Sequence, residues 1–150
     1  MKISIRPATK ADIPSVYQLV LELAVYENEP KAVTVSISEY ETAFDNGAFE
    51  ILVATDGDQI VGMAFYYDTY STWKGKMVYL EDFVVTQAYR RSGCGQLLFD
   101  AFVAAARAKG AKLVKWQVLD WNEPALKFYK KNHAIIEQNW WNGKIFLADC

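Results

Sequence analysis

The sequence predicts a mixed α/β domain in which a mostly antiparallel sheet is flanked by helices. Two β-rich runs flank an Asp-Gly turn at residues 56–57, which is a strong hairpin signal. Near the N-terminus, apolar residues recur at steps of three and four, as on one face of a helix. From residue 77 onward, strand and helix patterns alternate, which is typical of strand–helix–strand units.

The first half of the chain begins with an alternating strand that Pro7 ends. Thr9-Lys10-Ala11-Asp12 resembles a capping box, with Asp in place of the more usual Glu, and a helix begins behind it. The predicted elements are a strand at 3–5, a helix from 13 that ends at the Asn-Glu-Pro of 28–30, a helix at 38–46, and strands at 49–54 and 59–67.

The second half contains the longest predicted helix, which Gly110 ends. Its predicted elements are a strand at 77–85, a helix at 96–109, a strand at 113–118, a helix at 125–131 and a hairpin within 135–147. The hairpin prediction rests on Asn142-Gly143 as its turn. The predicted sheet is therefore mixed, with its antiparallel part first.

Composition predicts one globular domain over residues 1–150. The chain is 52% hydrophobic and 23% charged, with neither a signal core nor an apolar run of roughly 18 residues, so we expect a cytoplasmic protein without a membrane partner. A net charge of −2 disfavours nucleic acid as a partner. Two cysteines and one histidine predict no metal site.

The segment Arg90-Arg91-Ser92-Gly93-Cys94-Gly95-Gln96 lies between a predicted strand and the longest predicted helix. The first N–H groups of a helix have no partner within the helix and carry the positive end of its dipole. Glycines let a phosphate approach this backbone closely. The segment lacks the third glycine of the dinucleotide motif, where Leu98 stands, yet its context favours a pyrophosphate site over a plain turn.

Three motifs resemble the GNAT superfamily of N-acetyltransferases. Arg90-x-x-Gly93-x-Gly95, after a Phe-Val-Val strand, is similar to the loop that binds the pyrophosphate of acetyl-CoA. Arg6-Pro7-Ala8-Thr9-x-x-Asp12 resembles the family's opening, and residues 121–131 resemble its last motif. The resemblance spans nearly the whole chain. It implies a GNAT-like fold with acetyl-CoA as the co-substrate and no metal.

Within the superfamily, the sequence is most similar to the diamine (spermidine/spermine) N-acetyltransferases. The similarity lies in Tyr66-Tyr67, in Tyr79-Leu80-Glu81-Asp82-Phe83 and in Trp121-Asn122-Glu123-Pro124. It implies direct acetyl transfer to a primary amine of a diamine, a polyamine or a lysine-like amino acid. The alternatives are acetylation of a protein or peptide amine, and a regulatory module that binds CoA without catalysis.

The resemblance implies two catalytic residues. Glu81 is the candidate general base, directly or through water, because an alkylammonium with a pKa near ~10.4 must lose a proton before it attacks. Adjacent strand residues face opposite sides, so Glu81 and Asp82 share a side only where a bulge intervenes, as it does in the family. Tyr129 is the candidate general acid for the thiolate, with a core tyrosine as the alternative.

The resemblance also implies the contacts to acetyl-CoA. Backbone groups of the strand before the loop meet the acetyl group and the pantetheine arm, and Asn122 both caps a helix and contacts CoA. The expected set is Phe83, Val84, Val85, Arg90, Arg91, Ser92, Gly93, Cys94, Gly95, Gln96, Asn122, Glu123, Pro124, Ala125 and Tyr129.

For the acceptor, Tyr26-Glu27 matches a pair that the polyamine enzymes use near the amine. The expected set is Tyr26, Glu27, Glu81, Asp82, Lys115, Trp116 and Gln117, in which Glu27 and Asp82 supply negative charge for a cationic tail. Ser71 replaces an acidic residue, and Trp141-Asn142-Gly143 lacks the acidic–Gly–Trp arrangement, so short acceptors are favoured over long polyamines.

Two further expectations concern the C-terminal part. His133 replaces the family's glycine after the last helix, at a position that often requires left-handed dihedral angles. The aromatic-rich tail, together with the family's habit of pairing through C-terminal strands, predicts a homodimer.

Overall fold

The computed structural model describes residues 1–148. The chain forms two compact units, the first over Met1–Trp116 and the second from Gln117 onward. The first unit contains the whole sheet and three of the four α-helices, and the second contains α4 (Glu123–Lys131).

The first unit is built on a five-stranded sheet in the order β1-β2-β3-β4-β5. The strands are β1 (Ile3–Pro7), β2 (Glu50–Asp56), β3 (Gln59–Ser71), β4 (Gly75–Val85) and β5 (Leu113–Lys115). The first three pairings are antiparallel and the pairing of β4 with β5 is parallel. The mixed, mostly antiparallel sheet predicted from the sequence is therefore confirmed.

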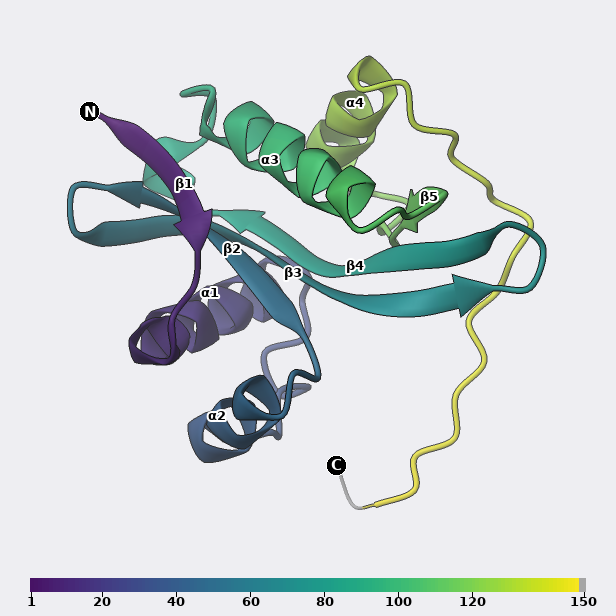
Figure 1. Ribbon diagram of the computed structural model, residues 1–150, viewed down its shortest axis with the longest axis horizontal. Coiled ribbons are helices and arrows are strands. Elements are labelled where there is room, and N and C mark those ends of the chain that lie inside the picture. Colours follow the sequence, from purple (N-terminus) through teal and green to yellow (C-terminus); the bar gives the residue numbers. More distant parts are fainter. Residues whose placement is uncertain (149–150) are drawn as a thin grey trace. The chain divides into compact units, whose positions relative to one another are not determined.

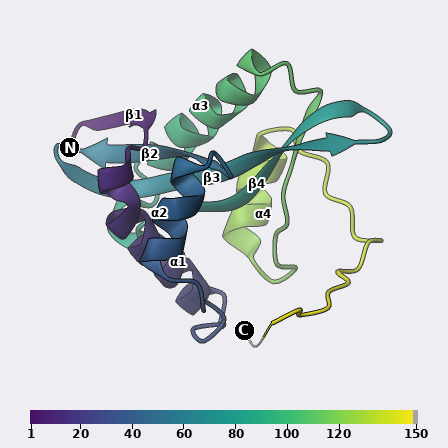
Figure 2. The same cartoon turned by 60° about the horizontal axis from the view of Figure 1, so that its bottom comes forward.

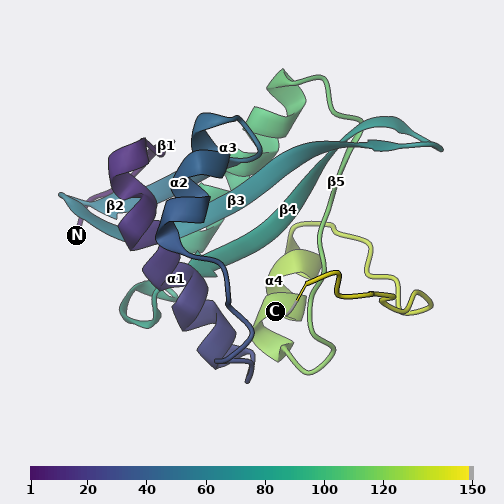
Figure 3. The same cartoon turned by 90° about the horizontal axis from the view of Figure 1, so that it is seen from below.

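Helices cover both faces of this sheet (Figure 1). On one face lie α1 (Ile13–Tyr26) and α2 (Ile37–Asp45), which Figure 3 shows in front of the strands. On the other face lies α3 (Cys94–Ala108). Short 3₁₀ turns, η1 (Lys10–Asp12) and η2 (Gln87–Tyr89), precede α1 and α3.

The start of α1 follows the predicted capping box. The Asp12 carboxylate accepts a hydrogen bond of 2.7 Å from the Thr9 N–H, and its two oxygens bind the guanidinium of Arg6. This satisfies a backbone donor at the helix entrance. The cap of α2 is Ser36, whose hydroxyl accepts from the Glu39 N–H, so this helix begins one residue before the sequence pattern indicates.

The apolar core lies between the helices and the sheet. On the α1 face, a buried apolar group joins the helix to β2, β3 and β4, and it consists of Ile13, Val16, Leu19, Val20, Ile51, Val53, Met63, Phe65 and Val84. On the opposite face, the Phe102 ring of α3 packs edge-on against Tyr66, with 5.1 Å between ring centroids. Burial of such side chains stabilises the fold by about 1.5–3 kcal/mol each.

Two C-terminal predictions are wrong. Residues 116–148 contain no strand, so the hairpin expected within 135–147 does not form, and the strand expected at 113–118 ends at Lys115. An isolated two-stranded hairpin is marginal in water without a layer to cover its apolar face. The apolar side chains of this tail, such as Ile135, Trp141 and Leu147, are largely exposed.

His133, which stands after α4 where the family has glycine, adopts the left-handed backbone conformation expected there. His133 has a φ of 67°, in the left-handed region that favours glycine. Its N–H donates to the Lys130 carbonyl, so the residue closes the last turn of α4.

Candidate active site

A β-bulge interrupts β4 at Glu81, in the strand where the family resemblance implies one. Phe65 of β3 lies opposite Asp82, whereas Tyr66 lies opposite Leu80, so Glu81 has no partner of its own. Residues directly opposite in a sheet point to the same face. Phe65 packs in the core under α1, which places Asp82 on the α1 face.

Glu81 points to this same face. Tyr67, two residues beyond Phe65 on β3, donates a hydrogen bond of 2.9 Å from its hydroxyl to Glu81 Oε1. Because residues two apart on a strand share a face, Tyr67 and hence Glu81 lie on the α1 side. The bulge therefore brings two consecutive carboxylates to one side of the sheet, which regular alternation forbids.

A third carboxylate, that of Glu27 at the end of α1, acts on Asp82. Burial, together with the charges of Glu81 and Glu27, raises the pKa of Asp82 to about 7. Burial likewise raises the pKa of Glu27. Carboxylates held together in a partly desolvated place resist ionisation, and a cation placed among them relieves the repulsion. The arrangement can hold an ammonium group and accept its proton.

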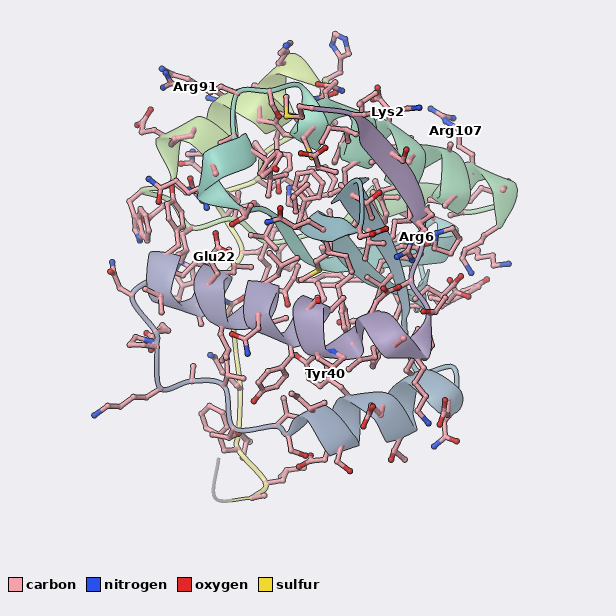
Figure 4. The ribbon with its side chains drawn as sticks, turned by 90° about the vertical axis from the view of Figure 1, so that its left-hand side faces the viewer. Lys2, Arg6, Glu22, Tyr40, Arg91 and Arg107 are labelled. Atoms are coloured by element: carbon pink, nitrogen blue, oxygen red, sulfur yellow. The ribbon has the colours of Figure 1, made fainter. Side chains whose placement is uncertain are left out.

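Tyrosines surround these carboxylates. The rings of Tyr67 and Tyr79 stack at 5.6 Å between centroids. Tyr40 of α2 packs against Tyr17 of α1 and is visible between the two helices in Figure 4. Burial and the charges of Asp82 and Glu81 raise the pKa of Tyr40 to about 12, which ties it electrostatically to the same site. Aromatic faces also attract cations.

The predicted pyrophosphate loop leads into the N-terminus of α3. Gly93 precedes the helix with a φ of 87°, and a Cβ at this glycine would meet nothing within 4 Å. Arg91 has a φ of 64° and an exposed side chain that points away from the sheet in Figure 4. The Ser92 hydroxyl accepts from the Cys94 N–H. Open space at Gly93, a helix N-terminus and an exposed arginine fit a pyrophosphate.

Arg90 lies differently from Arg91. Its Nε donates to the Val85 carbonyl at 2.9 Å, and its guanidinium lies 5.1 Å from the centre of the Tyr26 ring. Its terminal nitrogen is 3.9 Å from the carboxylate of Glu22. The predicted acceptor residue Tyr26 and the predicted cofactor residue Arg90 therefore contact each other.

The two parallel strands pair over a short stretch. Only Met77–Tyr79 of β4 is paired with β5, so the β4 backbone from Leu80 to Val85 has no partner strand on that side among residues 1–148. Within this stretch the side chain of Phe83 packs against Phe99 of α3, and that of Val84 is buried under α1. The predicted backbone contacts of residues 83–85 thus lie on an open strand edge.

The three predicted acceptor residues at the end of β5 and just beyond it have different surroundings. The side chain of Lys115 is exposed, and the Trp116 ring packs edge-on against Phe99 at 5.8 Å. Gln117 begins the second unit, where its side-chain amide donates to Asn142.

The second unit contains the remaining predicted residues. The Asn122 side chain accepts from the Ala125 N–H at 3.3 Å and caps α4, as the sequence indicates. Glu123 and Pro124 form the first turn, which the fixed φ of proline suits. Tyr129 is buried, and its ring packs edge-on against Phe128.

Sequence reasoning missed Tyr67 and Glu22 as members of this region. Tyr67 shares a strand face with Phe65 by simple alternation, so its face was readable, but its partner Glu81 depends on the bulge. Glu22 contacts Thr86, which is 64 residues away, and no local pattern signals such a pair.

The described residues contain neither a cluster of metal-ligating side chains nor a helix that could span a membrane. Within residues 1–148, His, Cys, Asp and Glu side chains form no group of three or more that is suited to a metal ion. Over the same residues, no helix has the length and apolar character needed to cross a membrane.

Known proteins resemble this chain in sequence and in fold. The chain matches the acetyltransferase (GNAT) family over residues 13–134. It is 33% identical over 152 residues to thialysine N-epsilon-acetyltransferase of Bos taurus, which covers 93% of this chain and 89% of that protein. It is also 33% identical over 148 residues to spermidine/spermine N(1)-acetyltransferase-like protein 1 of Homo sapiens, covering 91% of this chain and 21% of that protein. The chain thus spans about a fifth of the human protein.

Solved structures agree on the architecture. An aminoglycoside acetyltransferase from an uncultured soil metagenomic sample, in complex with trehalose, superposes with a TM-score of 0.80 at 24% identity. The match covers 97% of each chain. It shows that the fold is the same.

Proposed function

Because the chain belongs to the GNAT family of acetyltransferases, we propose that it transfers the acetyl group of acetyl-CoA to a primary amine of a small cationic acceptor. The observation that supports the acceptor class is the bulge in β4, which gathers Glu81 and Asp82 on one face, where the charge of Glu27 acts on Asp82. Three carboxylates with the tyrosines Tyr40, Tyr67 and Tyr79 near Glu81 and Asp82 suit an acceptor with more than one positive charge.

Acetyl-CoA supplies the activated acetyl thioester when it is bound. The proposed contacts to its pyrophosphate are the N–H groups of residues 91–96, with Arg91 as the exposed cation. The proposed contacts to the acetyl and pantetheine parts are backbone groups of Phe83, Val84 and Val85, on the open edge of β4. In the second unit, Asn122, Glu123, Pro124, Ala125 and Tyr129 complete the proposed set.

Glu81 is the proposed general base. An alkylammonium has a pKa near ~10.4, so almost none of it is neutral at pH 7 without help. The Glu81 carboxylate is exposed and held by Tyr67, which leaves its second oxygen to take the proton, directly or through a water molecule. Asp82 and Glu27 balance the remaining positive charge of the acceptor.

Tyr129 is the proposed general acid, because its phenol carries a proton that a departing thiolate can take. Tyr129→Phe should lower kcat by roughly 10²–10⁴-fold and leave the affinity for CoA nearly intact. Turnover at the wild-type rate would instead assign Tyr129 to the core of its unit.

The proposed acceptor is a short diamine or a lysine-like amine. The relatives are named for thialysine and for spermidine/spermine, compounds that carry at least two amino groups. Ser71 lies at the end of β3, where its hydroxyl accepts N–H groups of the following turn and adds no negative charge. Gly143 likewise adds none, so a long polyamine finds fewer carboxylates beyond the site.

An amine screen tests this proposal. Acetyl-CoA would be offered with a short diamine, spermine, a thioether analogue of lysine and a lysine-bearing peptide, and thiol release would give kcat/KM for each. We expect the diamine or the lysine analogue to be the best acceptor. A better peptide would favour a protein acetyltransferase, and no thiol release with any amine would favour a regulatory module that binds CoA.

We also propose the setting in which the enzyme works. It is a cytoplasmic homodimer in which residues 1–150 are a single catalytic domain, with neither nucleic acid nor membrane as a partner. The net charge of −2 and the exposed aromatic side chains Trp140 and Trp141 support this setting.

A further inference from the structure

We propose that Glu22 is a positioning residue for the pyrophosphate loop: from α1, it fixes the segment Thr86–Arg90 so that the N-terminus of α3 is presented to acetyl-CoA. The proposal rests on the proposed use of acetyl-CoA. Glu22 touches neither the acceptor carboxylates nor residues 91–96 in any contact described above, so its role would be exerted through the segment before the loop.

The Glu22 carboxylate receives donors from three residues of this segment. Its two oxygens accept from the Thr86 hydroxyl at 3.1 and 3.0 Å, and one of them accepts from the Gln87 N–H at 3.3 Å. The Arg90 guanidinium lies 3.9 Å away. Figure 4 shows Glu22 on the side of α1 that faces the strands. One carboxylate thereby orients the first and the last residues of the turn that carries the chain from β4 to the loop.

Arg90 extends this arrangement to the base of the loop. Its Nε is bound to the Val85 carbonyl, and the Tyr26 ring lies beneath its guanidinium. Arg90 and Arg91 are both exposed, but the three contacts of Arg90 hold its guanidinium against the protein, whereas the side chain of Arg91 points away from the sheet. We therefore assign Arg90 to the support of the loop and leave phosphate binding to Arg91 and the backbone.

A second carboxylate, at the end of β2, holds the same turn. The Tyr89 hydroxyl donates to the Asp56 carboxylate at 2.7 Å, and the Ser92 hydroxyl donates to the Tyr89 carbonyl. The turn is therefore held by two carboxylates from two different elements, Glu22 of α1 and Asp56 of β2. Fixing donors before the ligand arrives lowers the entropy lost on binding, which strengthens affinity without a direct contact.

The sign of the electrostatic effect makes the proposal testable. A carboxylate near an anion site repels phosphate, so if Glu22 were a bystander its neutralisation would tighten CoA binding. If Glu22 positions the loop, Glu22→Gln weakens CoA binding because the amide holds Thr86 and Arg90 less well. Thr86→Val removes a donor to Glu22 without changing net charge, and it should have an effect of the same direction.

The experiment measures the dissociation constants of CoA by calorimetry and of pantetheine, which lacks the pyrophosphate, by NMR titration. We expect Glu22→Gln and Thr86→Val each to weaken CoA about tenfold, equivalent to about 1.4 kcal/mol, and to change pantetheine binding less than twofold. Glu29→Gln, at an exposed carboxylate beyond α1, and Thr86→Ser, which retains the hydroxyl, are the matched controls and should bind CoA like the wild type.

Three results would overturn the proposal. They are unchanged or tighter CoA binding in Glu22→Gln, an equal loss for pantetheine, which would indicate general damage to the fold, and wild-type affinity in Thr86→Val. A wild-type protein that does not bind CoA at all would instead overturn the proposed function. If Glu22→Gln fails to fold, the CoA dissociation constants of Thr86→Val and Thr86→Ser decide whether the proposal holds.

Discussion

Glu27 lies at the C-terminal end of α1, where burial raises the pKa of its carboxyl. A carboxylate that is partly removed from water attracts a cation more strongly than an exposed one, for which the gain is only about 0–1 kcal/mol. Glu27→Gln should therefore raise KM for a diamine by about threefold or more, and KM for a monoamine of equal length much less. Steady-state rates with the two acceptors make the comparison. An equal rise for both would remove Glu27 from recognition of the second charge.

Asp82 makes the stability of the protein depend on pH. Its pKa rises from 3.8 to about 7 on folding, so the folded protein retains a proton that the unfolded chain releases between these values. The contribution of Asp82 to the free energy of unfolding is therefore fully present below about pH 4, and it is lost as the pH rises from there through 7. At neutral pH and above, the ionised carboxylate costs at most about 4 kcal/mol.

Asp82→Asn should remove this cost. The amide stays neutral at every pH, so the variant should melt several degrees above the wild type at pH 8 and close to it at pH 4. Thermal melts followed by circular dichroism at both pH values provide the measurement, with Asp58→Asn at an exposed turn as the control. A larger gain at pH 4 than at pH 8 would contradict the assignment of the charge repulsion to Asp82.

At the level of elements, the N-terminus of α3 is the part of the proposed cofactor site that a single change alters most directly. Gly95 lies in the first turn of this helix. An aspartate there suits the helix dipole and so preserves the fold, but it brings a negative charge toward the proposed phosphates. Gly95→Asp should weaken CoA by at least tenfold, about 1.4 kcal/mol or more.

Calorimetry tests this prediction, with Gly95→Ala as the neutral variant. Alanine adds only a methyl group in a helical position and should retain most of the affinity. If Gly95→Asp binds CoA as tightly as the wild type, the pyrophosphate does not lie at this helix.

The elements of the first unit were readable because their signals are local. The Asp-Gly turn between β2 and β3 and the glycine-rich entry to α3 each depend on residues a few positions apart. The bulge at Glu81 was different. From the sequence it follows only that two adjacent carboxylates share a face where a bulge intervenes. The position of the bulge depends on the register of β4 against β3, which the residues of a single strand do not encode.

The same distinction explains the tail. Asn142-Gly143 is a good local turn signal, but a hairpin also needs a surface that covers its apolar side chains. Ile145, Phe146 and Leu147 remain exposed, so no other segment of residues 1–148 covers the apolar side chains of the expected hairpin. Contacts at long sequence separation, such as Glu22 with Thr86, were hidden for the same reason.

At the level of the whole molecule, the long hairpin of β3 and β4, prominent in Figure 2, and the C-terminal tail both expose aromatic side chains. Trp73 is 82% exposed and Trp141 is 95% exposed. Exposed apolar surface of this kind is typical of subunit interfaces. We expect a dimer in solution.

Light scattering across a dilution series checks this expectation. The mass should be close to twice the 17.1 kDa of one chain and should fall only at the lowest concentrations. Trp141→Ser should shift the dissociation to higher concentration, because it removes an exposed ring from the tail without touching the core. A constant mass near 17.1 kDa at all concentrations would show that the chain works alone.

The bulge residue Glu81 of β4 also allows the proposed reactive group to change without any change in the core residues of the strand. Before the bulge, Val78 and Leu80 face α3, and beyond it Asp82 and Val84 face α1, so the even-numbered positions change sides at Glu81. If Glu81 were deleted, Leu80 would be followed directly by Asp82, and strict alternation would return with every core residue still on its own side. The proposed base therefore occupies the one position of the strand that the hydrophobic pattern does not use. A substitution of Glu81 therefore changes the reactive group while every core residue of β4 keeps its side of the sheet.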